Sequence, residues 1–598
     1  MSNKEKQDKE KRGLSRRQFL GLAGGVVGAA ALTTIGMKVQ WNTNEREIDL
    51  ENFSSSIAET DILVIGGGMA GLFAAVKGHD AGAKVLMVSK GRLGSSGQTP
   101  FAKGIFAYDA AKESMSLDEF TDTVTASAIN TNNPVYTRQM AEHSLERVND
   151  LKEWGFFDSP LYNKAFSKPI DERNIPVMER IMITHLIKEN GKIAGAAGFS
   201  LDETKIHIFK AKSVVLCTGA GGFKPNGFPI CDLTHDGTVM AYEIGAKVTG
   251  KEWNDGHSGS MDNPAACYDG WHGMFDMAPS TNTIDVHHDL GMEGNYSAYV
   301  LGNPVSSGPG SVSAEGGPYV PDGFDREMEE SGAPSGAPSG EDDGERPSGP
   351  PPGEDGGPPS GDEGGAPGMA ASASSGGASA GMAIHKSEGL VPINEKGESN
   401  IPGLYAAGDA LGSYMAGGIY TQIGSSLAGS AVQGAIVSEA AAEYVKGISQ
   451  PSISTSTISS IKESMLAPLN RDSGYGPAWV TQTLQGIMIP NFILYIKKEN
   501  LMQAALAYIE ELRDHHLPML RAANLHELRL AHETANMIVS AEMKLRASLM
   551  RTESRCSHYR LDYPDVDYKN WQAWINIYKG TDGQMRLEKQ LFDAWPAQ

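Results

Sequence analysis

Cysteine is scarce in this sequence, and its few residues are widely spaced. Only four occur among 598 residues, at Cys217, Cys231, Cys267 and Cys556. Iron–sulfur, zinc and c-type haem sites need clustered cysteines such as a Cys-x-x-Cys pair. This spacing excludes an evident site of those kinds in this chain. Two disulfides would be possible in an oxidising compartment, but nothing in the spacing indicates them.

Basic residues are also in deficit. The 51 Lys and Arg residues stand against 73 Asp and Glu residues, which gives a formal net charge of −22. An acidic surface repels nucleic acid and anionic lipid headgroups, so we expect neither as a partner. It would suit a cationic electron-transfer protein, although acidity is equally a common route to solubility.

The N-terminus lacks an apolar run long enough to cross a membrane. It has instead the features of an export signal. The Lys-rich residues 1–13 precede Ser15-Arg16-Arg17-Gln18-Phe19-Leu20, and a Gly/Ala-rich run covers 21–35. That order is typical of a bacterial twin-arginine export signal, and the run is too short for a membrane span. We predict export to the periplasm or the outer face of the cytoplasmic membrane. No clear Ala-x-Ala cleavage site is present, so membrane attachment through this segment stays open.

Large apolar residues are few between residues 321 and 382. This stretch consists mainly of Gly, Pro, Ser, Ala, Asp and Glu, with near-repeats at 332–335 and 336–339. Such a composition cannot offset the entropy of ordering the chain, so we predict disorder.

A glycine-rich turn between a strand and a helix is the strongest motif. The β-branched run 60–65 predicts a buried strand, and Gly66, Gly68 and Gly71 fit G-x-G-x-x-G before a helical pattern at 72–80. The glycines permit a tight turn, close approach to a pyrophosphate and helix–strand packing. The helix N-terminus offers free N–H groups to phosphates.

A second strand at 84–88 completes a βαβ unit, which is the context that makes this motif specific for a dinucleotide. The acid expected next to bind a ribose is replaced by Ser89-Lys90, and this argues against NAD. Further along, the patterns predict helices in 116–154, 425–444 and 477–555, and a β-meander in 175–215.

Five motifs in chain order resemble the flavoprotein subunits of the fumarate reductase, succinate dehydrogenase and adenylylsulfate reductase superfamily. They are Val64–Gly71 with Ser89-Lys90, Ser96–Gly104, Cys217–Gly222 with Thr234–Gly237, Pro402–Asp409 with Gly424–Leu427, and Glu553-Ser554-Arg555. The segment from Glu553 to Pro564, with Asn570-Trp571, looks most like the adenylylsulfate reductase alpha subunit.

This resemblance implies an α/β fold with a Rossmann-like FAD-binding domain, an inserted, reduced capping domain and a C-terminal helical domain. The expected boundaries are a signal at 1–40, a polar linker at 41–57, the FAD-binding domain at 58–261 and 387–448, the capping region at 262–386, and the helical domain with its tail at 449–598.

The resemblance also implies which residues contact FAD. They are Gly66, Gly68, Gly71, Ser89, Lys90, Ser96, Gly97, Thr218, Gly219, Asp236, Asp409, Gly424, Ser425, Ser426 and Leu427. Asp409 is expected near the ribityl group and phosphates. The helix that begins at 424–427 is expected to point its positive end at the flavin N1/O2 edge, where it stabilises an anionic reduced flavin. Succinate-type members attach FAD to a histidine, which is absent from 96–99 here, so we expect non-covalent FAD.

The substrate residues of fumarate-type members are only partly present. The segment 252–257 supplies His257, but Ser258-Gly259 replaces Pro-Thr, and Gln422 stands where an arginine is expected. Between residues 262 and 401 the arginines are Arg326 and Arg346. Without arginine clamps a dicarboxylate loses strong charge-assisted bonds, so we do not expect fumarate as the substrate.

His257 is the predicted catalytic residue, because a histidine near a flavin can exchange a proton while hydride moves at N5. Weaker candidates in the capping region are Tyr268, Trp271, His272, His287, His288 and Asp289. Arg555 and His558 are interpreted as contacts at the rim of the active site or to FAD, with a structural salt bridge as the alternative for Arg555. Trp253 covers the flavin or fills the core.

Three functions are compatible with these features. The first is an exported FAD-dependent oxidoreductase that acts on a small organic substrate and exchanges electrons with a separate cytochrome or iron–sulfur protein. The second is a sulfur oxidoreductase like adenylylsulfate reductase, which the predicted export disfavours because adenylylsulfate is cytoplasmic. The third is a flavin electron-transfer subunit without a substrate of its own.

Overall fold

The structure is a computed structural model of the 598-residue chain. It describes residues 41–42, 47–48, 50, 53–101, 105–111, 115–158, 162–223, 233–253, 255–257, 382–385, 388–412, 417–418, 425–489, 491–494 and 496–595. The export signal and the low-complexity stretch 321–381 lie outside these residues.

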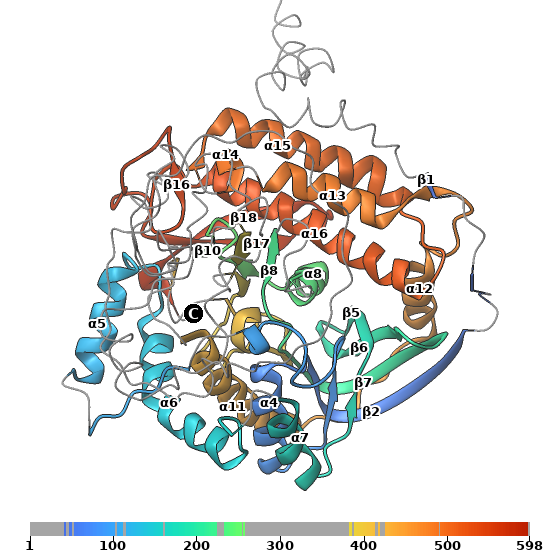
Figure 1. The fold of residues 1–598 in the computed structure, drawn as a ribbon, viewed down its shortest axis with the longest axis horizontal. Helices are drawn as coiled ribbons and strands as arrows, with labels where there is room; N and C mark the ends of the chain where they lie inside the picture. The colour runs from blue at the N-terminus through green and yellow to red at the C-terminus, as the bar shows by residue number, and fades with distance from the viewer. Residues whose placement is uncertain are drawn as a thin grey trace, which may run out of the picture.

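A mixed seven-stranded sheet forms the centre of the first domain (Figure 1). Its strands, in order across the sheet, are β4 (Val177–Met178), β3 (Val85–Val88), β2 (Ser54–Ile65), β7 (Lys205–Leu216), β6 (Lys192–Ser200) and β5 (Ile181–Glu189), with β13 (Leu404–Ala406) paired to β7. The pairs β4/β3, β3/β2, β2/β7 and β7/β13 are parallel, whereas β5, β6 and β7 form the predicted antiparallel meander. The parallel strands therefore end together at one edge, where α/β folds bind nucleotides.

Helix α4 (Met69–Asp80) follows β2 and packs against α11 (Ser425–Val445). The two helices approach closely because small residues line the contact. An added Cβ at Gly434 would lie 2.3 Å from the Ala70 carbonyl oxygen. Helices α5 (Leu117–Ser127), α6 (Pro134–Glu153) and α7 (Tyr162–Glu172) complete this side of the domain.

The capping region enters and leaves the fold through one small antiparallel sheet. Its strands are β8 (Gly221–Phe223), β11 (Met382–His385) and β10 (Asp255–His257). His257 lies opposite Met382, so the two ends of the segment 258–381 are adjacent. Helix α8 (Asp236–Glu243) precedes β10 in the chain.

The predicted C-terminal helices are present and have a core of their own. They are α12 (Thr455–Leu466), α13 (Pro477–Met488), α14 (Asn491–Leu494), α15 (Glu499–Glu511) and α16 (Leu525–Met550). Figure 1 shows α13, α15 and α16 side by side on the far side of α8 from the central sheet. Among the described helices, none is both long and apolar enough to span a bilayer.

Two segments differ from the sequence-based expectation. The tail after α16 is not a free extension: β17 (Ala573–Lys579) and β18 (Met585–Leu591) form a hairpin that joins β9 (Val248–Thr249) and β12 (Gly389–Leu390) in one sheet. The apolar positions of β17 pack into the main core, which explains the pairing.

The linker assignment 41–57 is also wrong in part. Strand β2 begins at Ser54, and β1 (Trp41–Asn42) pairs with β14 (Gly474–Tyr475) of the helical domain. The N-terminal half of β2 is largely exposed, and its polar composition is typical of a linker. Pairing with β7 along its whole length makes it a strand.

Candidate functional site

The glycine turn joins β2 to α4 as predicted, and two of its glycines are required by close backbone contacts. Gly66 has φ +121°, and an added Cβ would lie 2.0 Å from the Cys217 carbonyl oxygen at the end of β7. A Cβ at Gly71 would lie 1.9 Å from the Gly66 carbonyl oxygen. Positive φ and these clashes exclude any side chain at Gly66. The first turn of α4 therefore packs directly against the backbone at the ends of β2 and β7.

Gly68 has a different role, because it is the N-cap residue of α4 and faces open space. Its φ is −85°, and it contributes no side-chain cap. An added Cβ would meet only Thr99 Oγ1, at 3.4 Å, among the described residues. The helix N-terminus is thus exposed to a ligand, which is the geometry that binds a pyrophosphate.

Further predicted residues surround this turn. Gln98 Nε2 donates to Asp409 Oδ2 at 3.2 Å, which brings the segment after β3 to the turn after β13. Added Cβ atoms at Gly97 and Gly219 would meet no described atom within 4 Å. Buried Thr218 Oγ1 has no hydrogen-bond partner within the described part of the chain. Open space, a helix N-terminus and a spare hydroxyl fit a dinucleotide at this edge.

Helix α11 supplies a second N-terminus to the site. Ser425, Ser426 and Leu427 are its first three residues, and Ser425 and Leu427 are buried. Gly424 lies outside the described residues. Close behind, Gln433 Oε1 accepts from the Gly408 N–H at 2.9 Å, which fixes the turn that carries Asp409 to α11. The positive helix end and the Asp409 turn are therefore held as one unit.

Three predicted cofactor contacts, Ser89, Lys90 and Asp236, are engaged inside the protein. Ser89 is buried beneath the turn, where its Oγ would lie 2.8 Å from a Cβ added at Gly67. Lys90 Nζ lies 2.7 Å from Asp236 Oδ2 and 2.8 Å from Glu533 Oε1 of α16. This ion network links the segment after β3 to α8 and to the helical domain. Contact between these residues and FAD stays a prediction.

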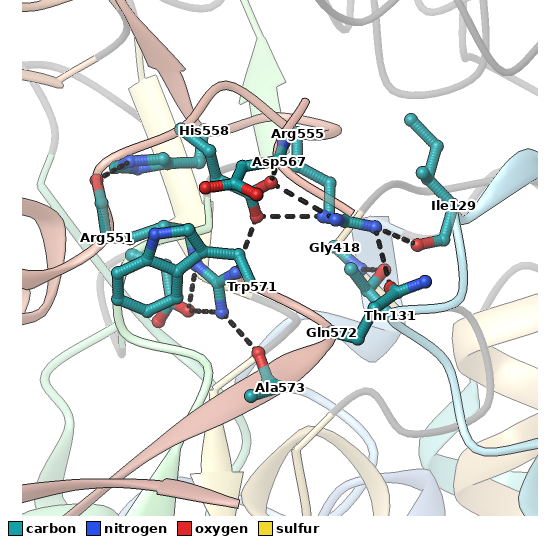
Figure 2. A network of polar contacts seen from close by, with 12 residues as sticks. Ile129, Thr131, Gly418, Arg551, Arg555, His558, Asp567, Trp571, Gln572 and Ala573 are labelled. Atoms are coloured by element: carbon teal, nitrogen blue, oxygen red, sulfur yellow. Dashed lines mark hydrogen bonds and ion pairs between the residues drawn. The ribbon is translucent and has the colours of Figure 1, made fainter. Parts of the chain in front are cut away.

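Four distant segments converge at a second place, and Figure 2 shows three of them, around Thr131, Gly418 and Arg555. Arg555 Nη1 donates to the Ile129 carbonyl oxygen at 2.6 Å, Ser557 Oγ donates to the Gly418 carbonyl oxygen at 2.6 Å, and Gly418 N–H donates to Thr131 Oγ1 at 2.7 Å. An added Cβ at Gly418 would lie 2.8 Å from the Trp253 ring. Ile129 has φ +48°, a strained value for a β-branched residue that the surrounding contacts must hold.

A buried ion network lies beneath this convergence. Arg551 Nε and Nη2 lie 3.0 and 2.9 Å from Glu252 Oε1, and Arg551 Nη1 donates to Glu553 Oε1 at 2.8 Å. Arg555 binds both oxygens of Glu553, at 2.8 and 3.1 Å. The side chains of all four residues are fully buried. Arg555 therefore forms a structural salt bridge, which is the alternative that the sequence allowed, and its contact with the active-site rim or FAD stays a prediction.

His558 is also buried, and its contact with the active-site rim or FAD stays a prediction. Burial, with Lys497, Arg551 and other cations close by, holds the pKa of His558 well below its usual range. The ring is therefore neutral. Its Nδ1 accepts from Lys497 Nζ at 2.9 Å, and its Nε2 donates to the Arg551 carbonyl oxygen at 3.2 Å. His558 is therefore a core residue, and its hydrogen bond holds the Lys497 side chain in place.

Trp253 fills the space between these groups. It is buried, with the Arg551 guanidinium carbon 4.6 Å from its ring centroid and the His558 ring edge-on at 6.1 Å. These contacts show that Trp253 fills core space, and contact between its ring and the flavin stays a prediction. The backbone of His257 ends β10 four residues later, whereas its side chain and the weaker catalytic candidates, from Tyr268 to Asp289, lie outside the described residues.

The sequence interpretation missed the buried lysines Lys251, Lys497 and Lys544. One signal was available in α16, where Lys544 occurs at helical spacing with Met537, Ala541 and Ser548 on the buried face. A cation at such a position usually has a specific partner. The partners themselves come from distant segments and could not be read from spacing.

This fold and site define a dinucleotide-binding α/β protein with a second, helical domain over the nucleotide edge. Comparisons with known proteins identify the nucleotide. Residues 61–164 match the model "FAD binding domain", and residues 481–594 match "Fumarate reductase flavoprotein C-term". The chain is therefore an FAD-dependent oxidoreductase, and it is similar to the flavoproteins of fumarate reductase, succinate dehydrogenase and adenylylsulfate reductase.

Individual relatives are distant but extend along the chain. One subunit of the fumarate reductase (CoM/CoB) of Methanothermobacter marburgensis is 24% identical over 596 residues, covering 89% of this chain and 99% of its own. The structure of adenylylsulfate reductase from Archaeoglobus fulgidus aligns with a TM-score of 0.65 at 18% identity, covering 92% of this chain and 99% of that one. A quinol-fumarate reductase aligns with a TM-score of 0.66 at 17% identity, covering 90% and 98%. The predicted fold and the FAD cofactor are confirmed.

Proposed function

We propose that this chain is an exported enzyme that transfers hydride between non-covalently bound FAD and a small organic substrate other than fumarate. The observation that carries the proposal is the open dinucleotide edge, with the N-terminus of α4 at Gly68 and that of α11 at Ser425. FAD, when bound, supplies hydride exchange at its N5 atom. The residues of the chain supply binding, orientation and the accompanying proton.

Each element has a distinct task in this proposal. The turn 66–71 holds the pyrophosphate against the α4 N-terminus, and the positive end of α11 stabilises negative charge on the reduced flavin. His257 gives or takes the proton that accompanies hydride transfer. Trp253 and Gly418 pack without an intervening gap and help to exclude water.

The charges of the site argue against a dicarboxylate substrate. Arg551, Arg555 and Arg560 are the large cations near the convergence, and all three are fully buried with carboxylate and carbonyl partners from the protein. Each of the three guanidinium groups therefore already binds protein oxygens where a substrate carboxylate would have to bind. Gln422 stands at the position where fumarate-type relatives have an arginine. A less acidic substrate fits these groups better.

The source of electrons is proposed to be a separate protein. The chain has no clustered cysteines for a metal centre of its own, and the relative in Methanothermobacter is named as one subunit of its enzyme. With a net charge of −22, the chain would favour a basic partner domain, by complementary charge.

His257→Gln is expected to lower turnover by about 100-fold or more, because a positioned proton donor contributes roughly 10²–10⁴-fold. The flavin of the purified protein is photoreduced without oxygen, and its reoxidation by candidate acceptors is followed by absorbance. His79→Gln, on the exposed end of α4, is the matched control. A His257 variant with normal turnover would remove histidine from the mechanism. If wild-type protein returns electrons only to dyes and proteins, the chain is an electron carrier instead.

Replacing Arg16 and Arg17 together by lysine is expected to retain the protein in the cytoplasm, since the export route reads the arginine pair. Cell fractionation with immunodetection measures the exported share. Lys4→Gln with Lys6→Gln, which keeps the pair, should be exported normally. Unchanged export of the double-lysine variant would contradict the proposed route.

A further inference from the structure

The turn 251–253, which leads into β10 and His257, accepts a hydrogen bond at every residue from a lysine of the helical domain. Lys544 Nζ donates to the carbonyl oxygens of Lys251 and Trp253, at 3.3 and 3.2 Å. Lys497 Nζ donates to the intervening Glu252 carbonyl oxygen at 2.5 Å. Three consecutive carbonyls are thus bound by the Nζ atoms of two lysines.

The side chains of the same turn are fixed as well. Lys251 Nζ lies 2.8 Å from Glu388 Oε2 and donates to Ser540 Oγ of α16 at 2.9 Å. Glu388 stands just after β11, so this ion pair joins the two chain segments that flank the capping region. The Glu252 carboxylate is held by Arg551, and the Trp253 ring lies under the same guanidinium.

This arrangement is costly if its purpose is stability alone. Lys251 and Lys497 are fully buried and Lys544 is 1% exposed. Carbonyl dipoles replace only part of the hydration that a buried ammonium loses, and well-packed apolar residues often stabilise a core as well as buried charges do. Burial holds the pKa of Lys544 down to about 7. What the lysines provide in return is a fixed direction for three peptide groups.

We propose that Lys497 and Lys544 are positioning residues, which hold the turn 251–253 from the helical domain and thereby place β10 and His257 for proton transfer. The inference rests on the proposed role of His257. The lysines do not touch the substrate in this proposal. They act through the backbone, and the carboxylates of Glu252 and Glu388 offset part of the loss of hydration at Lys544.

The test uses full-length, flavin-loaded Lys544→Met and Lys497→Met, with Lys498→Met as matched control because Lys498 is the exposed neighbour of Lys497. Hydrogen exchange of peptides covering 250–257 is compared with that of β2. We expect exchange in 250–257 to accelerate by about 10-fold or more, with β2 unchanged. Unchanged exchange in 250–257 in both variants would overturn the proposal.

Turnover separates positioning from mere structural support. In both variants kcat is expected to fall by about 10-fold or more, with flavin content retained and KM changed by less than about twofold. Faster exchange with normal kcat would overturn the positioning role. If either methionine variant fails to fold, Lys544→Gln replaces it in the test. Glutamine keeps an N–H donor for the carbonyl oxygens, so hydrogen exchange in 250–257 of this variant should stay nearly as slow as in the wild type. If wild-type protein has no turnover with any acceptor, the proposed function falls, while the exchange comparison still decides whether the lysines hold the turn.

Discussion

Gly68→Ala is expected to yield a folded protein that has lost FAD. The backbone of Gly68 has φ −85°, which alanine adopts without strain, and the new methyl group would meet only Thr99 Oγ1, at 3.4 Å, among the described residues. The methyl would instead occupy the space above the first turn of α4 that a pyrophosphate must enter. The FAD dissociation constant should rise by about 100-fold or more, which corresponds to about 2.7 kcal/mol.

The measurement is flavin content after purification, followed by FAD titration of the apoprotein, with circular dichroism to verify the fold. Gly486→Ala is the control, because Gly486 lies in α13 and an added Cβ meets nothing within 4 Å. That variant should keep its flavin. Gly66→Ala is not a useful test, since its clash with the Cys217 carbonyl would disturb the sheet itself. Stoichiometric FAD in Gly68→Ala would place the pyrophosphate elsewhere.

Arg551→Met is expected to destabilise the protein by about 3–5 kcal/mol, the usual cost of removing one partner of a buried ion pair. The Glu252 carboxylate would lose both of its contacts with Arg551, and its second oxygen has no hydrogen-bond partner within the described residues. A buried carboxylate without a partner is the source of the penalty. Loss of the guanidinium also removes the cation that lies over Trp253 and Trp571.

Urea unfolding followed by tryptophan fluorescence measures this effect. Arg586→Met removes an exposed ion pair with Asp582 and should change stability by less than about 1 kcal/mol. Combining Arg551→Met with Glu252→Gln should recover part of the loss, because the unpaired charge is then gone. A cost below about 1 kcal/mol for Arg551→Met would mean that the buried network contributes little to stability.

Local sequence patterns were sufficient to predict the elements at the dinucleotide-binding edge of the sheet. The apolar run before Gly66 and the spacing of Gly66, Gly68 and Gly71 predicted β2, the turn and α4, and the structure confirms all three. The Ala-rich pattern after residue 424 likewise predicted α11. These signals depend on contacts within about twenty residues, so they are visible in the chain itself.

Pairing between strands that are far apart in the chain could not be predicted from the sequence in this way. The aromatic tail gave no sign that β17 and β18 would join β9, and the polar start of β2 gave no sign of its pairing with β7. The sequence also gave no sign that Arg555 and His558 are buried by segments far away in the chain. Burial depends on which segments meet, and residue type alone does not report it.

By itself, the sequence determined that this protein has a glycine turn for a dinucleotide and an FAD-type series of motifs, and it predicted a substrate other than fumarate. Only the tertiary structure decided that the buried arginines are structural and that lysines of the helical domain hold the turn before His257. The physical reason is that backbone conformation at a glycine is a local property. The partner of a buried charge is fixed by packing across the whole chain.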